Sequence, residues 1–319
     1  TATASPAGLG TAAAARREWQ VTGSRMSDTR RRILIFLLVT FGIAWAYAFL
    51  AVYPMSRSAL ASYLPMATKL VTGAIMLAPS IAVIVTRAVT GEGFQGTSHL
   101  TSAGFDKTWR YWLAGYLGPV VLAAVGACLY YLVVLGAFDP SMSYAREELP
   151  LLGNLDLVFE GIPFVLGIIV VAPMANFVYS FGEEWGWRGY LLPKLLEEGS
   201  MTRAILASGL VWGAWNAPLV VLGSEYGAGY AGFPVAGVVA CCAYCTAVGV
   251  FLSYLTLRSG SCIPATLAHG SLDGTAGNPL VGPAPTGILG GVGFVVAAAL
   301  LLARLCRLER AGEPLLVEE

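Results

Sequence analysis

Apolar segments long enough to cross a bilayer recur along the whole chain and are separated by short polar stretches. A transmembrane helix needs about 20 mainly apolar residues to cross a hydrocarbon layer of roughly 30 Å. Segments of this kind lie near residues 33–54, 65–89, 109–137, 160–181, 204–222, 232–257, 262–279 and 285–305. The connections between them are too short for an inserted soluble domain. The pattern therefore predicts an all-α polytopic membrane protein with about eight transmembrane helices.

The composition agrees with a bilayer as the surrounding solvent. Of the 319 residues, 56% are hydrophobic and 12% are charged, against roughly 25% charged residues in a soluble domain. The formal net charge is +0, so the overall balance gives no electrostatic support for binding nucleic acid. The expected partners are the lipid bilayer and molecules held within it, with no nucleic acid.

The distribution of basic residues predicts the orientation, because Lys and Arg are enriched in cytoplasmic loops. If the N-terminus is cytoplasmic, only Arg57, Lys69 and Arg146 of the 19 Lys and Arg residues fall on the outer side. An even number of spans then places both termini in the cytoplasm. The Ala- and Gly-rich composition favours a bacterial source, so we expect a multi-pass protein of the bacterial plasma membrane.

Composition also predicts how the chain is divided. Residues 1–25 are rich in Ala, Thr and Gly and carry no pattern, so we expect a flexible extension or an added leader outside the fold. Residues 26–310 are expected to form a single transmembrane helical domain, and residues 311–319 a short cytoplasmic tail. The six cysteines lie within or beside apolar stretches and show no spacing typical of a secreted disulfide framework.

Three stretches place polar or ionisable residues where a membrane segment should exclude them, which makes each a candidate functional site. The first reads Phe-Gly-Glu183-Glu184-Trp-Gly-Trp-Arg188. On a helix, Glu184 and Arg188 can pair, whereas Glu183 points about 100° away from Glu184. This suits one carboxylate held by an arginine and another free to act as a base. The alternative is a charged interfacial cap with Trp185, Trp187 and Tyr190 as membrane anchors.

The second stretch reads Trp212-Gly-Ala-Trp-Asn216-Ala-Pro218 and lies inside the fifth apolar segment. Pro218 removes a backbone hydrogen bond and is expected to break the helix. Such breaks are tolerated at membrane depth where they border a cavity within the protein. Asn216 is therefore a candidate hydrogen-bond donor in a site, or an amide that joins two helices.

The third stretch lies in the short seventh segment and holds His269 and Asp273. A spacing of four residues places both on one face of a helix. A carboxylate beside a histidine fixes the imidazole tautomer and can raise its basicity. With Glu183 and Asn216, these residues provide a base, an amide donor and a His–Asp pair. Such a set can activate water and stabilise an oxyanion, which indicates hydrolytic chemistry.

These stretches resemble the signature motifs of the CPBP family, which comprises the type II CAAX prenyl endopeptidases (also called the Abi family) and bacteriocin-processing relatives. The first family motif, EExxxR, is matched by Glu183, Glu184 and Arg188. The second motif is an aromatic residue, three further residues and a histidine, and it reads Trp212-Gly-Ala-Trp-Asn216 here. The eight-helix count is also similar to that of the family.

The last family motif, His-x-x-x-Asn/Asp, is matched by His269 and Asp273. The resemblance implies that residues 26–310 are an intramembrane peptidase domain acting on a membrane-embedded or lipidated substrate. It further implies that Glu183 is the general base, that Glu184 and Arg188 support the site, and that His269 with Asp273 binds the water or stabilises the oxyanion.

The chain departs from the family pattern at Asn216, where the family has histidine. An amide does not titrate near neutral pH and is a poor ligand for zinc, although it can still donate to an oxyanion. We therefore expect no cofactor. If a divalent metal such as zinc binds, its ligands would be Glu183, His269 and Asp273.

Three hypotheses remain open on the sequence alone. The first is an intramembrane endopeptidase, and Asn216 is then a natural or introduced change that weakens or abolishes catalysis. The second is a catalytically dead relative that binds membrane peptides as a scaffold or as a bacteriocin-immunity-type protein. The third is a small transporter, which the ionisable residues and the broken fifth segment allow.

Overall fold

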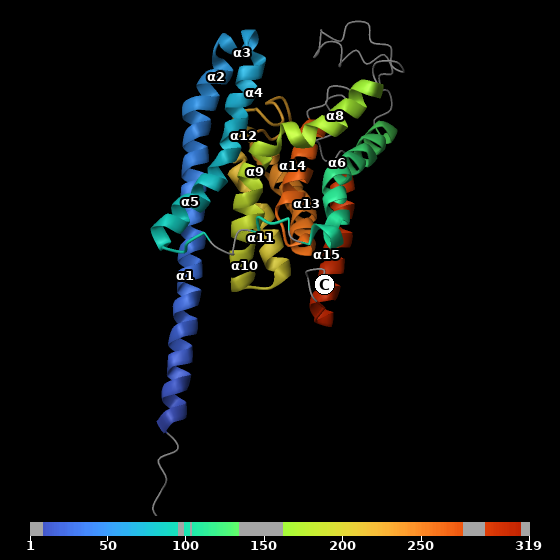
Figure 1. The fold of residues 1–319 in the computed structure, drawn as a ribbon. Helices are drawn as coiled ribbons and strands as arrows, with labels where there is room; N and C mark the ends of the chain where they lie inside the picture. The colour runs from blue at the N-terminus through green and yellow to red at the C-terminus, as the bar shows by residue number, and fades with distance from the viewer. Residues whose placement is uncertain (1–8, 95–98, 103, 134–161, 277–290, 314–319) are drawn as a thin grey trace, which may run out of the picture.

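The computed structural model describes residues 9–94, 99–102, 104–133, 162–276 and 291–313, and all the elements within these residues are helices (Figure 1). In chain order the helices are α1 (Leu9–Tyr47), the short π-helical turn η1 (Ala48–Val52), α2 (Tyr53–Arg57), α3 (Leu60–Tyr63), α4 (Pro65–Gly73), η2 (Ala74–Leu77), α5 (Ala78–Thr90), α6 (Phe105–Val133), α8 (Ile162–Ala175), α9 (Phe177–Gly186), the π-helical turn η5 (Trp187–Leu191), α10 (Leu192–Glu198), α11 (Met201–Trp215), α12 (Ala217–Val221), α13 (Val235–Ser259), α14 (Ile263–Ala276) and α15 (Val292–Ala311). The predicted all-α membrane architecture is confirmed.

Four of the predicted transmembrane segments coincide with helices that are long and apolar enough to cross a membrane. These helical segments are Asp28–Arg57, Ala67–Thr90, Phe105–Val133 and Val235–Ser259. The other four predicted segments overlap α8 and α9, α11 and α12, α14, and α15, which are interrupted, shorter or more highly charged. Residues 134–137, 160–161, 277–279 and 285–290 of the predicted segments lie outside the described residues. The number of crossings and the sides of the termini stay predictions.

Helix α1 begins earlier than the sequence pattern suggested. It starts at Leu9 and runs without interruption to Tyr47, so residues 9–25 are helical where a flexible extension was expected. The run Ala12–Ala15 explains this difference, because alanine has the highest intrinsic helix propensity. The division of the chain at residues 26 and 310 stays a prediction.

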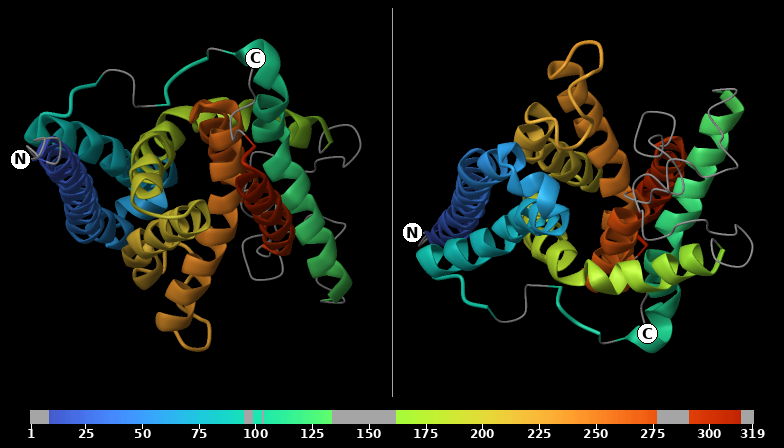
Figure 2. Two further views of the ribbon diagram at one scale, coloured as in Figure 1. Left: turned by 90° about the horizontal axis from the view of Figure 1, so that it is seen from below. Right: turned by 90° about the horizontal axis from the view of Figure 1, so that it is seen from above.

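Viewed along the long axis of the molecule, the helices lie side by side in a row of neighbouring pairs (Figure 2). Helix α1 lies against α5, α5 against α9, α9 against α14, and α14 against α6. Helix α11 packs along α13, which in turn contacts α15. The three motif-bearing helices α9, α11 and α14 are therefore in the middle, enclosed by α5, α13 and α6.

Glycines permit the close approach of these central helices, as small residues do in membrane helix pairs. A Cβ atom at Gly186 of α9 would lie 2.4 Å from Cβ of Pro79 in α5, and one at Gly213 of α11 would lie 2.4 Å from Cα of Cys242 in α13. Neither position has room for a side chain. The glycines within the first and second motifs thus set the distance of α9 and α11 from their neighbours.

Candidate active site

The first motif spans the end of α9 and the beginning of η5, and its side chains Glu183, Glu184 and Arg188 are buried. Glu183 and Glu184 belong to α9, whereas Arg188 belongs to the π-helical turn Trp187–Leu191. Single π-helical turns inside α-helices occur frequently at functional sites. Trp187 and Tyr190 are 0% and 1% exposed. The alternative of membrane anchors at the interface is therefore wrong for Trp187 and Tyr190, because their polar atoms bond to groups inside the protein.

Glu184 binds both Arg188 and His269. Nη1 of Arg188 donates to Oε1 of Glu184 at 2.9 Å, and both side chains are 0% exposed, which confirms the predicted i,i+4 pair. Nδ1 of His269 lies 2.9 Å from the same oxygen. A carboxylate held by an arginine can only accept, so Nδ1 carries a proton and donates it to Glu184. The orientation of the His269 ring is thereby fixed.

The other ring nitrogen of His269 faces Asp273. Nε2 lies 3.6 Å from Oδ1 of Asp273, so the two residues share one face of α14, as predicted. Oγ of Ser180 in α9 donates to Oδ2 of Asp273 at 3.3 Å. Nδ2 of Asn176 donates to the carbonyl of Gly270 at 3.1 Å and joins the same two helices. The His–Asp pair is thus held against the helix that carries both glutamates.

Glu183 is held through one of its two carboxylate oxygens. Oε2 accepts from Nε1 of Trp187 at 3.0 Å and from Nε1 of Trp212 at 2.5 Å. In the described part of the chain, no hydrogen bond joins another residue to Oε1. The side chain is buried. One oxygen is therefore fixed by two donors, and the other can accept from a bound molecule.

Trp212 contacts three other residues of the site: Arg188, His269 and Glu183. The guanidinium carbon of Arg188 lies 4.7 Å from the centroid of the Trp212 ring, which is a cation–π geometry. The ring of His269 meets the indole edge-on, with 5.2 Å between centroids. The indole N–H donates to Glu183. The aromatic residue of the second motif therefore joins the first and last motifs.

Asn216 caps α11 one turn beyond Trp212. Helix α11 ends at Trp215 and α12 begins at Ala217, so the helix break predicted from Pro218 is confirmed. Nδ2 of Asn216 donates to the carbonyl of Trp212 at 3.2 Å and lies 4.0 Å from Sγ of Cys245. The amide is thus directed to its own helix and to α13.

Comparison with known families agrees with this arrangement. Residues 162–275 match the family model described as "Type II CAAX prenyl endopeptidase Rce1-like". The matched segment runs from the beginning of α8 almost to the end of α14, and so includes all three motifs. The match supports a CPBP-family peptidase domain over these residues. A search of curated proteins gave no match.

The family match and the apolar helices together indicate where the protein is located and which class of enzyme it resembles. Together with the long apolar helices, the match indicates an integral membrane protein. The family description supports a CAAX-type endopeptidase, which is a hydrolase acting on prenylated, membrane-associated proteins.

The donor set of the CPBP domain does not fit a zinc ion. No three His, Cys, Asp or Glu side chains within the described residues are arranged to hold a metal. Asn216 would be a poor zinc ligand in place of the family histidine.

The carboxylates, Arg188 and the His–Asp pair were predicted as site residues, and the structure brings them together. The hydrogen bonds from Trp187 and Trp212 to Glu183 were not predicted from the sequence. For Trp187 a signal was available, because it follows Glu183 by four residues and shares its helix face. For Trp212 the sequence holds none, since its partner is on another helix.

A second polar cluster ties the π-helical turn to the N-terminal helices. Left-handed Gly91 (φ 64°) ends α5, and the next residue, Glu92, binds Nζ of Lys194 at 2.8 Å and Oη of Tyr190 at 2.8 Å. Arg32 of α1 lies 3.8 Å away. Burial alone would raise the pKa of Glu92, but the hydrogen bonds from Lys194 and Tyr190 hold this pKa below its ordinary value.

Proposed function

We propose that this protein is an intramembrane endopeptidase that hydrolyses a peptide bond in a membrane-embedded or lipidated peptide or protein. The observation that carries the proposal is Glu183, a buried carboxylate with one oxygen fixed by two indoles and the other without a bond to the described residues. The next residue, Glu184, fixes the orientation of His269, and the Trp212 ring contacts both Glu183 and His269. A preorganised base next to a preorganised imidazole suits hydrolysis.

In this proposal Glu183 activates the attacking water. The free oxygen Oε1 accepts a proton as the water oxygen bonds to the scissile carbonyl carbon, which becomes tetrahedral. The C–N bond then breaks, and Glu183 returns the proton to the leaving amine. The products are a new carboxyl group and a new amine, and Glu183 ends as it began, which is the behaviour of a general base and then a general acid.

His269 stabilises the tetrahedral intermediate. Since Nδ1 donates to Glu184, Nε2 is the ring atom left for the oxyanion. It donates there when the ring carries a second proton, as imidazolium, and the carboxylate of Asp273 3.6 Å away favours that proton. Arg188 keeps Glu184 in place and does not touch the reacting atoms. The amide of Asn216 would reach an oxyanion only after leaving the Trp212 carbonyl that it now binds.

Cleavage of lipidated peptides by the purified protein in lipid vesicles tests the proposal. A prenylated CAAX peptide carrying a fluorophore and a quencher is the first substrate, with the unprenylated peptide in parallel. We expect Glu183→Gln to lose cleavage by at least about a hundredfold, the low end of a general base's contribution. The matched control is Glu198→Gln in α10, whose pair with Arg30 is away from the site; Arg30 is 67% exposed. This variant should cleave like the unchanged protein.

Asn216→His, the family residue, distinguishes the endopeptidase from its alternative. If the unchanged chain is nearly silent and Asn216→His cleaves, the machinery is intact and Asn216 inactivates it. If the unchanged chain and Asn216→His both fail while the lipidated peptide still binds, the protein is a membrane peptide-binding scaffold or a bacteriocin-immunity-type protein. That second function is favoured by one observation, the commitment of the Asn216 amide to its own helix.

A further inference from the structure

We infer that Trp187 and Trp212 are positioning residues that clamp Glu183 by a single carboxylate oxygen and so assign the other oxygen as the one that takes the proton from water. The inference rests on the proposed function, because it specifies how the base of that reaction is held. It concerns two indole N–H groups that meet on the same atom, Oε2 of Glu183, at 3.0 and 2.5 Å.

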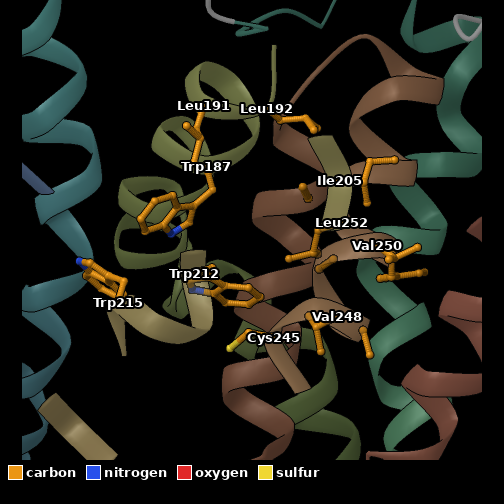
Figure 3. Packing of buried hydrophobic residues seen from close by; sticks show 14 of the residues in the cluster. Trp187, Leu191, Leu192, Ile205, Trp212, Trp215, Cys245, Val248, Val250 and Leu252 are labelled. Atoms are coloured by element: carbon orange, nitrogen blue, oxygen red, sulfur yellow. The ribbon is translucent and has the colours of Figure 1, made fainter. Parts of the chain in front are cut away.

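The two donors come from different helices. Trp187 follows Glu183 by one turn in the same helical stretch, and Trp212 reaches it from α11. In Figure 3 the indole nitrogens of Trp187 and Trp212 lie on the facing edges of the two rings. The nitrogen of the nearby Trp215 lies on the edge that is turned away from them. Nε1 of Trp215 donates instead to the carbonyl of Thr40 at 3.3 Å. The core thus holds three neighbouring indoles, of which two bind the glutamate.

Such a clamp has two physical consequences. Hydrogen bonds to the ionised form of a carboxyl group favour that form, and in a low-dielectric interior they are stronger than in water. Because both donors occupy Oε2, the rotation of the carboxylate is fixed and Oε1 faces the remaining space. Phenylalanine would keep an aromatic ring at either position but could not donate, so the N–H contribution can be removed by itself.

Other charged or titratable groups also face Glu183, and the phenylalanine variants leave them in place. They are Glu184 in α9, His269 and Asp273 in α14, and Cys245 in α13. Arg188 in η5 is paired with Glu184 and lies over the Trp212 ring. A phenylalanine at position 212 also keeps a ring face for Arg188 and a ring edge for His269. A change in pH dependence after this substitution therefore reports the lost N–H donor.

The test compares Trp187→Phe and Trp212→Phe with Trp215→Phe, the matched control whose indole does not touch Glu183. We measure kcat/KM for the lipidated peptide against pH in vesicles, using Asn216→His as the background if the unchanged chain is too slow. In Trp187→Phe and Trp212→Phe the acidic limb of the profile should move to higher pH by about one unit each, the size expected for losing a hydrogen bond to a charged group. Trp215→Phe should keep the original limb.

Coinciding acidic limbs in all four proteins would overturn the clamp while leaving the endopeptidase intact. A fully active Glu183→Gln variant would instead overturn the proposed function itself. If a phenylalanine variant unfolds, benzothienylalanine at the same position keeps the indole shape without the N–H and decides in the same way. A shift with benzothienylalanine supports the clamp, and an unchanged limb contradicts it.

Discussion

The ion pair between Arg188 and Glu184 is the most deeply buried charge pair in the described part of the chain, with both side chains 0% exposed. Its hydrogen bonding is incomplete, since Nε and Nη2 of Arg188 and Oε2 of Glu184 have no partner there. The Trp212 ring beneath the guanidinium compensates part of this deficit. A buried pair of this kind is sensitive to the loss of one partner, because the other charge then remains without compensation.

Removal of the Arg188 charge alone should therefore lower the free energy of unfolding more than removal of both the Arg188 and Glu184 charges. We predict that Arg188→Met destabilises the protein by about 3–5 kcal/mol. In the double variant with Glu184→Gln the cost should be clearly smaller than the sum of the single costs, because no unpaired charge is left. Unfolding of the purified proteins in detergent measures all three values. Additive costs would show that the two residues do not act as a pair.

Contacts between site residues could be predicted from the sequence only where both residues lie on the same helix. The Glu184–Arg188 pair and the His269–Asp273 face follow from four-residue spacings. The bond between Glu183 and Trp212 joins residues 29 apart in sequence on different helices, and no periodicity reports such a contact. The interfacial reading of Trp187 was wrong for a related reason, since tryptophan near charged residues is typical of both a membrane surface and a buried site.

At the scale of elements, the position of α11 depends on its contact with α13. Gly209 and Gly213 both lie against the α13 backbone, where an added Cβ would come within 2.7 Å of Cα of Thr246 and 2.4 Å of Cα of Cys242. Trp212 projects from the same turn of α11. A small displacement of this helix would therefore move an indole N–H away from Glu183.

We predict that Gly213→Ala lowers both stability and activity. The added methyl group has no space, and overpacking of this kind costs about 1–3 kcal/mol. Gly42→Ala is the matched control, since Gly42 is also inside a helix but has nothing within 4 Å of an added Cβ. Unfolding temperature and peptide cleavage are measured on both variants. Equal behaviour of the two would contradict the role of the close α11–α13 contact.

The sequence predicted some helices and helix breaks correctly and missed others. The long apolar helices and the break at Pro218 were predicted correctly, because hydropathy and proline chemistry act locally. The π-helical turn Trp187–Leu191 was not. One extra residue in a turn hardly changes the pattern of apolar positions, so only the three-dimensional packing reveals it.

For the molecule as a whole, the cluster around Glu92 connects parts of the chain that are distant in sequence. It joins α1 through Arg32, the end of α5 through Glu92 itself, and the site-bearing stretch through Tyr190 and Lys194. The side chain of Glu92 is 7% exposed, so these contacts are shielded from solvent. The cluster therefore stabilises the attachment of α1 and α5 to the CPBP domain.

Glu92 should make stability depend on pH in one direction. Its folded-state pKa is held below the ordinary value of 4.5, so its contribution is complete above that pH and is lost as the pH falls through the lowered pKa. We predict that Glu92→Gln lowers the unfolding temperature at pH 7, and that its difference from the unchanged protein disappears under acidic conditions. Glu198→Gln removes a carboxylate whose partner Arg30 is 67% exposed, so its difference from the unchanged protein should be small at any pH. A constant Glu92→Gln difference down to the lowest pH would contradict this account.

The overall architecture was accessible from sequence because a bilayer imposes long apolar helices on any chain that crosses it. The number of crossings was less accessible. The helices that carry the site, α9, α11 and α14, are short or interrupted and hold the polar residues that a hydropathy criterion penalises. The features that make this region a candidate active site are thus the same ones that obscure it as a set of transmembrane segments.

The most direct test of the endopeptidase is cleavage of the prenylated peptide in vesicles prepared in water enriched in heavy oxygen, with the products identified by mass spectrometry. The account predicts two fragments, one of which carries a single heavy oxygen atom in its new carboxyl group, formed by the unchanged protein or by Asn216→His and absent with Glu183→Gln. Binding of the intact peptide without cleavage by any of the three proteins, or equal cleavage by Glu183→Gln, would contradict it.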